Sequence, residues 1–337
     1  MLFLSLAILF ICLYTHAQMT HAPGARPDTG IGVPLRGDLD SSYYEYSGMA
    51  KWHNKVLLIP QYPDKWESSL FALDSIDIDK TIAGNGTAST PYTRISITNL
   101  SEMRHHLSGT YQGFEGAVVV GNTIYFTLEF SEDTCYLLKG YISEGKNKTT
   151  ITLDNFFKLP KLHNAYVNAG YESISYLPGT QKLIVAFEKN SDPAQPSVLL
   201  VDTSFTKQPV PVHFATPMYF RLTDMAAAGK NTFMGINHYY NDYNRKRREY
   251  NYYIGDDNVA AAASQMNDVS PTGNNYTGIV ALTLAGDEIG WARKKFISYG
   301  DENWEGIIPF KNGFLMVVDE YPKDGSPRMR YFEWDKD

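Results

Sequence analysis

The chain has 337 residues, of which 20% are charged and 14% aromatic, and its formal net charge is −7 at pH 7. This length can bury a large hydrophobic core, and the composition is that of a folded protein rather than a disordered one. The negative charge argues against a nucleic-acid polymer as partner, because phosphate binding favours a basic face. Small anionic molecules, glycans and metal cations remain as ligand classes.

The N-terminal segment predicts export. Residues 1–17 form an apolar run that is short for a membrane span and ends in Thr15-His16-Ala17, which is typical of a signal peptide cleaved after Ala17. Residues 18–40 are rich in Pro and Gly and predict an irregular leader. We therefore expect residues 41–337 to form one domain of a secreted or periplasmic protein, without a membrane anchor after cleavage.

Five hairpins then repeat along the chain. Each is a short apolar strand, a tight turn with Gly or Asn, and a second strand rich in β-branched or aromatic residues. In chain order they read YSGMAKWHNKVLLIPQ from Tyr46, FEGAVVVGNTIYFTLE from Phe114, YESISYLPGTQKLIVAFE from Tyr171, TDMAAAGKNTFMGINH from Thr223 and WEGIIPFKNGFLMVVD from Trp304.

The spacing between hairpins leaves room for two more strands in each repeat. We expect these at 68–74, 134–142, 148–157, 197–202, 209–214, 277–284, 289–297 and 328–335, and we expect no long helix. Four-stranded repeats of this kind predict an all-β fold, a five-bladed β-propeller, in which the segment after Gly30 pairs with the last blade. A six-bladed ring that uses part of 240–276 is the alternative.

Two polar positions recur in register. Aligned at the first strands are Ser47, Glu115, Glu172, Asp224 and Glu305. At the ends of the second strands are Gln61, Glu129, Glu188, His238 and Asp319. Because first strands line the channel of a propeller, the first set should converge on one axis and the second should surround it.

Convergence of the first set predicts a cation. Several carboxylates packed together without a counter-charge would repel one another, and some would take up protons. Ca²⁺ accepts six to eight oxygen ligands in flexible geometry, and all five aligned residues carry side-chain oxygen. The alternative is that these residues cap strand amides while waters fill the channel.

This arrangement resembles the calcium-activated nucleotidase (apyrase) family, from about residue 43 to the C-terminus. The resemblance implies a five-bladed propeller whose central calcium is held by serine and acidic side chains, one from each blade. Ser47, Glu115, Glu172 and Glu305 match that pattern, whereas Asp224 stands where the family has serine. The Glu-Gly before a first strand is also similar to phytase-like and esterase-like propellers.

The segment 239–276 is a long insertion with four consecutive basic residues, 245–248, among several tyrosines. Arg245, Arg247 and Arg248 suit a lid that holds phosphate or carboxylate, and a solvated charge run is the other interpretation.

Three functions follow from these patterns. The first is a calcium-dependent phosphohydrolase acting on nucleotides or other phosphate esters, in which Glu129, Glu188, Asp319 or His238 serves catalysis and Gln61 and the arginines bind substrate. The second is a glycan-active hydrolase that uses channel carboxylates as acid and base. The third is a non-catalytic binding propeller with structural calcium.

Overall fold

The computed structural model describes residues 28–40, 44–130, 134–160, 169–190, 196–239, 276–298, 302–319 and 328–334. The predicted signal peptide, the first part of the leader and almost all of the 239–276 insertion lie outside these residues. Arg245, Arg247 and Arg248 belong to that insertion and are therefore not described either.

The described strands form five antiparallel units of four strands each, numbered here in chain order. Unit 1 contains β2 (Tyr46–Trp52), β3 (Lys55–Pro60), β4 (Ser69–Asp74) and β5 (Thr93–Ile97). Unit 2 contains β6 (Tyr111–Val120), β7 (Thr123–Phe130), β8 (Thr134–Glu144) and β9 (Thr149–Pro160). Unit 3 contains β10 (Ser173–Leu177), β11 (Lys182–Ala186), β12 (Val198–Asp202) and β13 (Val210–Phe214). Unit 4 contains β14 (Arg221–Ala227), β15 (Thr232–Tyr239), β16 (Tyr276–Ala285) and β17 (Glu288–Ser298). Unit 5 contains β18 (Trp304–Phe310), β19 (Gly313–Val318), β20 (Met329–Glu333) and the N-terminal β1 (Ile31–Gly32).

The units are joined in two ways. The outer strands β5 and β9 pair in parallel, as do β13 and β17, so units 1 and 2 form one eight-stranded sheet and units 3 and 4 another. Unit 5 stays a four-stranded sheet, in which β1 pairs with β20 through Ile31 opposite Tyr331. The all-β class, the five hairpins and the pairing of the segment after Gly30 with the last repeat are confirmed.

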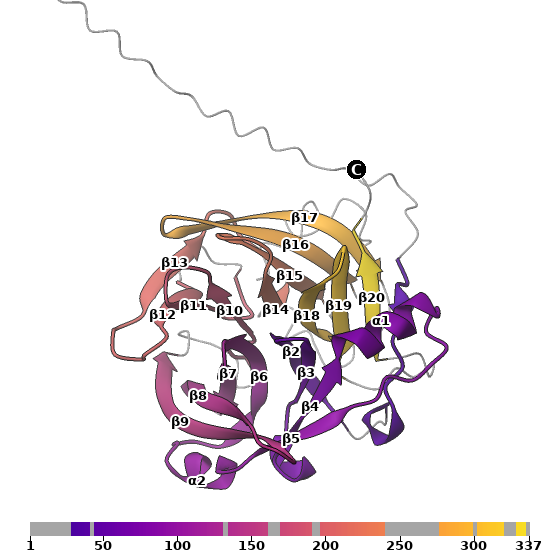
Figure 1. Ribbon diagram of the computed structural model, residues 1–337. Coiled ribbons are helices and arrows are strands. Elements are labelled where there is room, and N and C mark those ends of the chain that lie inside the picture. The colour runs from indigo at the N-terminus through magenta and orange to yellow at the C-terminus, as the bar shows by residue number, and fades with distance from the viewer. Residues whose placement is uncertain are drawn as a thin grey trace, which may run out of the picture.

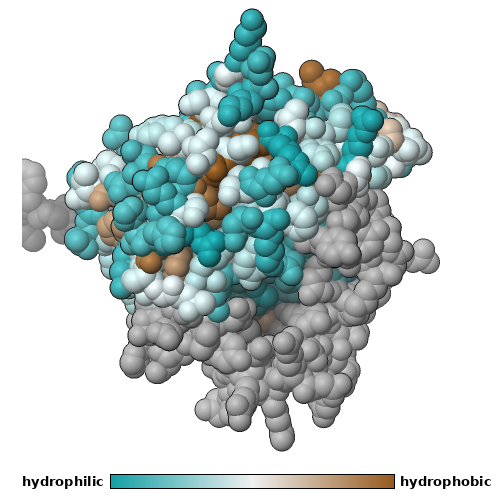
Figure 2. Space-filling view, turned by 90° about the horizontal axis from the view of Figure 1, so that it is seen from below, coloured by the Kyte–Doolittle hydropathy of each residue, from teal (hydrophilic) through white to brown (hydrophobic). Residues whose placement is uncertain are grey.

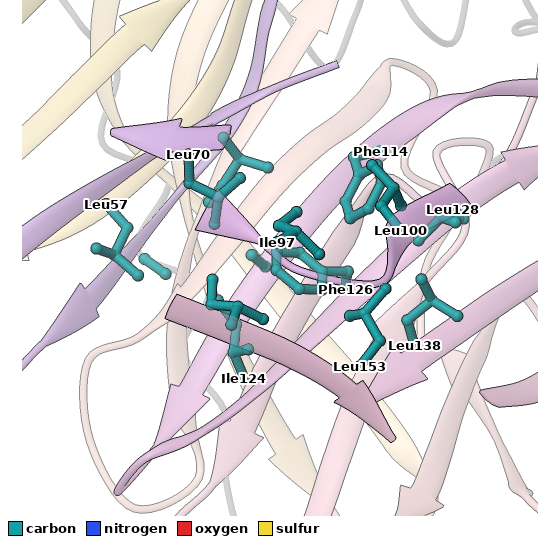
Figure 3. Packing of buried hydrophobic residues seen from close by; sticks show 14 of the residues in the cluster. Leu57, Leu70, Ile97, Leu100, Phe114, Ile124, Phe126, Leu128, Leu138 and Leu153 are labelled. Carbon is teal, nitrogen blue, oxygen red and sulfur yellow. The ribbon is translucent and has the colours of Figure 1, made fainter. Parts of the chain in front are cut away.

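The first strands of the units surround the centre of the molecule (Figure 1). β2 contacts β6, β6 contacts β10, β10 contacts β14, β14 contacts β18, and β18 returns to β2. Between each neighbouring pair of units lies a hydrophobic cluster of the described residues. The cluster between units 1 and 2 includes Leu57, Ile97 and Leu100 on one side and Phe114 and Phe126 on the other (Figure 3).

Packing between units explains why the second strands are apolar on both faces. Leu57 and Ile59 of β3 face unit 2, whereas Val56 and Leu58 face unit 5. Successive strand residues point to opposite faces, so a sheet between two others is buried on both. This is the reason for uninterrupted apolar runs such as GFLMVV in β19.

The short helix α1 (Ser75–Ala83) and the strand β5 were not predicted. The sequence SIDIDKTIA begins with the alternation of a strand, but only Ile78, Thr81 and Ile82 of this helix are buried. The other helical segments are short: α2 (Leu100–His105), η1 (Gly37–Asp40) and η2 (Pro63–Trp66).

None of the helices in the described ranges has the length and apolar character needed to cross a membrane. On the side of the molecule seen in Figure 2, hydrophilic residues cover most of the described surface and hydrophobic residues form only small patches.

Candidate functional site

A β-bulge marks the start of four inner strands. The strand register skips Ser47 in β2, Glu115 and Gly116 in β6, Thr223 in β14 and Glu305 in β18. A bulge leaves one residue unpaired with the neighbouring strand and re-aims its side chain, which suits a residue that points toward an axis. Glu172 directly precedes β10, the shortest inner strand.

Backbone hydrogen bonds between units fix which residues are equivalent. The amide of Tyr46 donates to the carbonyl of Asp319, that of Phe114 to Gln61, and that of Leu222 to Glu188. Tyr46, Phe114 and Leu222 therefore hold the same place, and the residues that follow them are Ser47, Glu115 and Thr223. The prediction of Asp224 as the fourth aligned residue was wrong by one position, because the repeat was aligned from Thr223 instead of Leu222.

The position after each aligned residue makes the contact between inner strands. A Cβ on Gly48 would lie 2.9 Å from the carbonyl oxygen of Glu115, and one on Gly116 would lie 2.5 Å from that of Glu172. Asp224 holds this same position in unit 4, where its Oδ2 accepts the Ile307 amide at 2.8 Å. Its Oδ1 accepts the Met225 amide at 2.8 Å, so both carboxylate oxygens of Asp224 bind backbone.

Two of the aligned residues carry hydroxyls that tie one unit to the next. Ser47 Oγ donates to the Phe114 carbonyl at 2.6 Å, and Thr223 Oγ1 donates to the Trp304 carbonyl at 2.6 Å. Both side chains are buried. These bonds have the same geometry in units 1 and 4, which agrees with the corrected alignment.

Arg221, which sequence reasoning missed, lies among the acidic side chains. Its Nη2 contacts Glu172 Oε1 at 2.6 Å and Glu305 Oε1 at 3.5 Å, while its Nε donates to Glu188 Oε2 at 2.7 Å. The equivalent positions in other units hold unlike residues, including Glu45, Gly170 and Asn303, whose carbonyls accept equivalent backbone bonds. No repeating pattern could therefore single this arginine out.

Glu115 belongs to the same group of buried acidic side chains, but the charges that act on it are those of other acids. Burial raises the pKa of its carboxyl well above 4.5, and the negative charges of Glu129, Glu305 and Asp319 raise it further, while a hydrogen bond from Gln61 opposes the rise. Its Oε1 is buried and has no hydrogen-bond partner among the described residues. Glu115 is therefore a carboxyl group that favours its protonated form.

Glu172 and Glu305 are held differently. Burial also raises the pKa of each carboxyl, that of Glu172 well above 4.5, although the Arg221 guanidinium opposes this rise in both. Glu305 Oε1 further accepts a bond from Asn303 Nδ2 at 2.6 Å. Glu172 keeps 12% of its side-chain surface exposed, but its Oε2 is buried and lacks a hydrogen-bond partner within the described ranges.

The second predicted set lies next to the first. Gln61 and Asp319 accept amides of inner strands through their carbonyls, as described above. The Glu129 carboxyl group packs on Gly170, since a Cβ there would lie 3.3 Å from its Cδ. The Glu188 carboxylate is fully buried between Arg221 and the Gly170 amide, to which Oε1 is bonded at 3.3 Å.

His238 is buried and shares a 2.9 Å hydrogen bond between Nδ1 and Thr277 Oγ1. Burial and the nearby charge of Arg221 lower its pKa to about 3. The imidazole is therefore neutral at physiological pH, which removes it as a proton donor there.

The arrangement does not fit the Ca²⁺ implied by the resemblance. The oxygen donors are of the right type, but a guanidinium lies among Glu172, Glu188 and Glu305, and it would repel a cation bound there. Within the described ranges, no group of three or more His, Cys, Asp or Glu side chains is arranged to hold a metal ion.

Comparison with solved structures gave distant matches. No family model matches the chain, and no curated protein does. The xylosidase/arabinofuranosidase CoXyl43 from a compost metagenome, solved in a calcium-free form, is 9% identical, with 93% of this chain and 96% of that chain covered and a TM-score of 0.46. A GH43_1 enzyme of Xanthomonas citri is 6% identical, with coverage of 90% and 91% and a TM-score of 0.44. A glucose dehydrogenase is 9% identical, with coverage of 88% and 98% and a TM-score of 0.42. Likenesses at this level carry no inference about activity.

Proposed function

We propose that the five units are the blades of a five-bladed β-propeller with the inner strands around its axis. The support is the closed cycle of contacts from β2 through β6, β10, β14 and β18 back to β2, together with one hydrophobic cluster between each neighbouring pair. Side chains from different units then meet at one place, as Arg221 does with Glu172, Glu188 and Glu305.

We propose that the protein is a hydrolase of glycans. Its active site would be the axial cluster, which consists of Glu115, Glu172, Glu188, Glu305 and Arg221. The observation that carries the proposal is that two carboxyl groups of one cluster have different charged neighbours. Glu115 is buried among other acids, whereas Glu172 contacts Arg221 at 2.6 Å. Glycoside hydrolysis needs one protonated and one ionised carboxyl group on either side of the bond that breaks.

In this scheme Glu115 is the general acid and protonates the leaving oxygen of the glycosidic bond. Glu172 is the carboxylate that activates water or attacks the sugar, with Oε1 held by Arg221 and Oε2 left without a hydrogen-bond partner among the described residues. Arg221 orients Glu172 and favours its ionised form, and Glu305 and Asn303 complete the hydrogen-bonded support. The two reacting groups come from neighbouring units, so the reaction depends on closure of the ring.

A calcium-dependent phosphohydrolase is less well supported by this geometry. Its metal would have to share the cluster with Arg221, and its predicted arginine lid lies outside the described residues. Export after cleavage at Ala17 stays a prediction. N-terminal sequencing of the mature protein would check the cleavage.

The test is a screen of aryl glycosides, oligosaccharides, nucleotides and phosphate esters, run in EDTA and again with Ca²⁺. We expect release of sugar in EDTA, and loss of most of it in Glu115→Gln and Glu172→Gln. Glu144→Gln, at an exposed residue at the end of β8, is the matched control and should keep full activity. Phosphate release that requires Ca²⁺ would overturn the proposal in favour of the phosphohydrolase. Silence across the panel would favour the binding propeller.

A further inference from the structure

We propose that Arg221 is the built-in counter-ion of the axial carboxylates, that it excludes divalent cations from them, and that its removal turns the cluster into a divalent-cation site. This inference concerns charge balance and binding, so it does not depend on the glycan hydrolysis proposed above.

The first support is the way in which the guanidinium is engaged. Nε and Nη2 reach carboxylates that come from two other parts of the ring, Glu172 and Glu188 of unit 3 and Glu305 of unit 5. Only 17% of the Arg221 side-chain surface is exposed, and none of that of Glu188. A rigid guanidinium fork with several donors suits such a shared site better than a single ammonium point charge would.

The second support is the electrostatic consequence of that position. A guanidinium within 3.5 Å of three carboxylates already neutralises part of their repulsion. A divalent cation bound to the same oxygens would lie close to the guanidinium. Because the site is buried, the two positive charges would repel each other strongly. Arginine keeps its proton at any ordinary pH, so loss of its proton cannot remove this repulsion.

The third support is what would remain without the guanidinium. Glu172, Glu188 and Glu305 would be left as buried carboxylates, beside Glu115 with its own unpartnered Oε1. Glu172 Oε2 also has no hydrogen-bond partner among the described residues. Oxygen donors of this kind prefer hard cations, and several carboxylates together prefer Ca²⁺ to the more strictly octahedral Mg²⁺.

The experiment compares wild type, Arg221→Met and Arg221→Lys after dialysis against EDTA. Arg94→Met is the control, because Arg94 pairs with an exposed glutamate, Glu67, on the surface. Thermal unfolding is followed in EDTA and in rising Ca²⁺, and Ca²⁺ binding is measured by calorimetry.

We expect no shift in melting temperature and no stoichiometric binding of Ca²⁺ in wild type, Arg221→Lys and Arg94→Met. Arg221→Met should melt at a lower temperature in EDTA, bind one Ca²⁺ per chain and gain melting temperature as the Ca²⁺ concentration rises, since a ligand bound only by the folded state stabilises it. If this variant folds only when Ca²⁺ is present, the proposal is equally supported.

Stoichiometric Ca²⁺ binding by the wild type, with a rise in melting temperature, would overturn the exclusion. An Arg221→Met protein that shows no response to Ca²⁺, or that fails to fold with and without it, would overturn the cation site.

Discussion

Single residues decide the charge state of the axial cluster. Glu115 and Glu172 hold equivalent positions in neighbouring units, yet the nearest charges around Glu115 are acidic, whereas Glu172 contacts a guanidinium. Their identities and their approximate convergence could be predicted from the repeat. Arg221 could not, because its importance comes from contacts that cross two unit boundaries and leave no trace in the register of the hairpins.

We expect Glu115→Gln to become more stable than wild type as the pH rises. Burial and neighbouring acids raise the folded-state pKa well above 4.5, so the folded chain keeps a proton that the unfolded chain releases. Wild type should therefore lose stability from about pH 4.5 up through the folded-state pKa, by up to about 1.4 kcal/mol for each pH unit. Urea unfolding of both proteins from about pH 4 to about pH 8 measures the difference. A difference that does not grow with pH, or that also appears in Glu144→Gln, would contradict this.

The pKa of His238 is shifted in the opposite direction, so its contribution to stability should change at low pH. Its folded-state pKa of about 3 lies below the ordinary 6.5, so the unfolded chain takes up a proton that the folded chain refuses. Its contribution to stability is present above pH 6.5 and is lost as the pH falls toward 3. His238→Asn keeps a group that can bond Thr277, so the advantage of wild type over this variant should shrink as the pH falls from about 7 to about 5. A stability difference between wild type and His238→Asn that stays constant over this pH range would contradict the assignment.

At the scale of the element, the inner strands explain the Glu-Gly pairs in the sequence. Gly48 and Gly116 follow the aligned residues because the backbone of the next unit comes too close for a Cβ. A Cβ on Gly306 would lie 2.7 Å from Val317 Cγ1 and 3.1 Å from the backbone of Gly48. Ser173 and Asp224 take the same place and use their side chains for the contact, through bonds to Leu222 and Ile307. The five hairpins could be predicted because apolar runs and turn residues are local signals. The register of unit 4 could not, because Asp224 resembles an axial acid in sequence and only the strand pairing shows the bulge at Thr223.

Gly116→Ala should destabilise the protein by about 1–3 kcal/mol, the usual cost of forcing extra volume into a packed interior. The new Cβ would lie 2.5 Å from the Glu172 carbonyl oxygen, which is backbone and cannot rotate away. Gly290→Ala is the control, because a Cβ there meets nothing within 4 Å. Chemical unfolding of the two variants compares them directly. Equal stabilities would show that the inner strands are not packed as described.

Thr223→Val should cost about 1–3 kcal/mol, because it leaves the buried Trp304 carbonyl without the hydroxyl that bonds it at 2.6 Å. Thr223→Ser keeps the hydroxyl, as Ser47 does in unit 1, and should cost less. Chemical unfolding of wild type and the two variants measures the free energy of unfolding that each substitution costs. If serine is as damaging as valine, the hydrogen bond between units 4 and 5 is not what Thr223 contributes.

At the scale of the whole molecule, ring closure brings the distant parts of the site together. Phe114 and Trp304, which precede Glu115 and Glu305, accept hydroxyl bonds from units 1 and 4, and β1 completes unit 5 by pairing with β20. The repeat and its closing strand could be predicted from spacing and strand patterns. The parallel pairing of β5 with β9 and of β13 with β17 could not, because β5 was missed and outer strands carry no shared motif.

The central claim is that axial carboxylates, balanced by Arg221, act as acid and base without a metal. The most direct measurement is the pH dependence of kcat/KM for glycan hydrolysis in EDTA, for wild type and Glu115→Gln. We predict a bell-shaped profile for wild type, whose alkaline limb reports the acid, and loss of most activity together with that limb in Glu115→Gln. Hydrolysis that disappears in EDTA and returns with Ca²⁺, or an unchanged alkaline limb in Glu115→Gln, would contradict the claim.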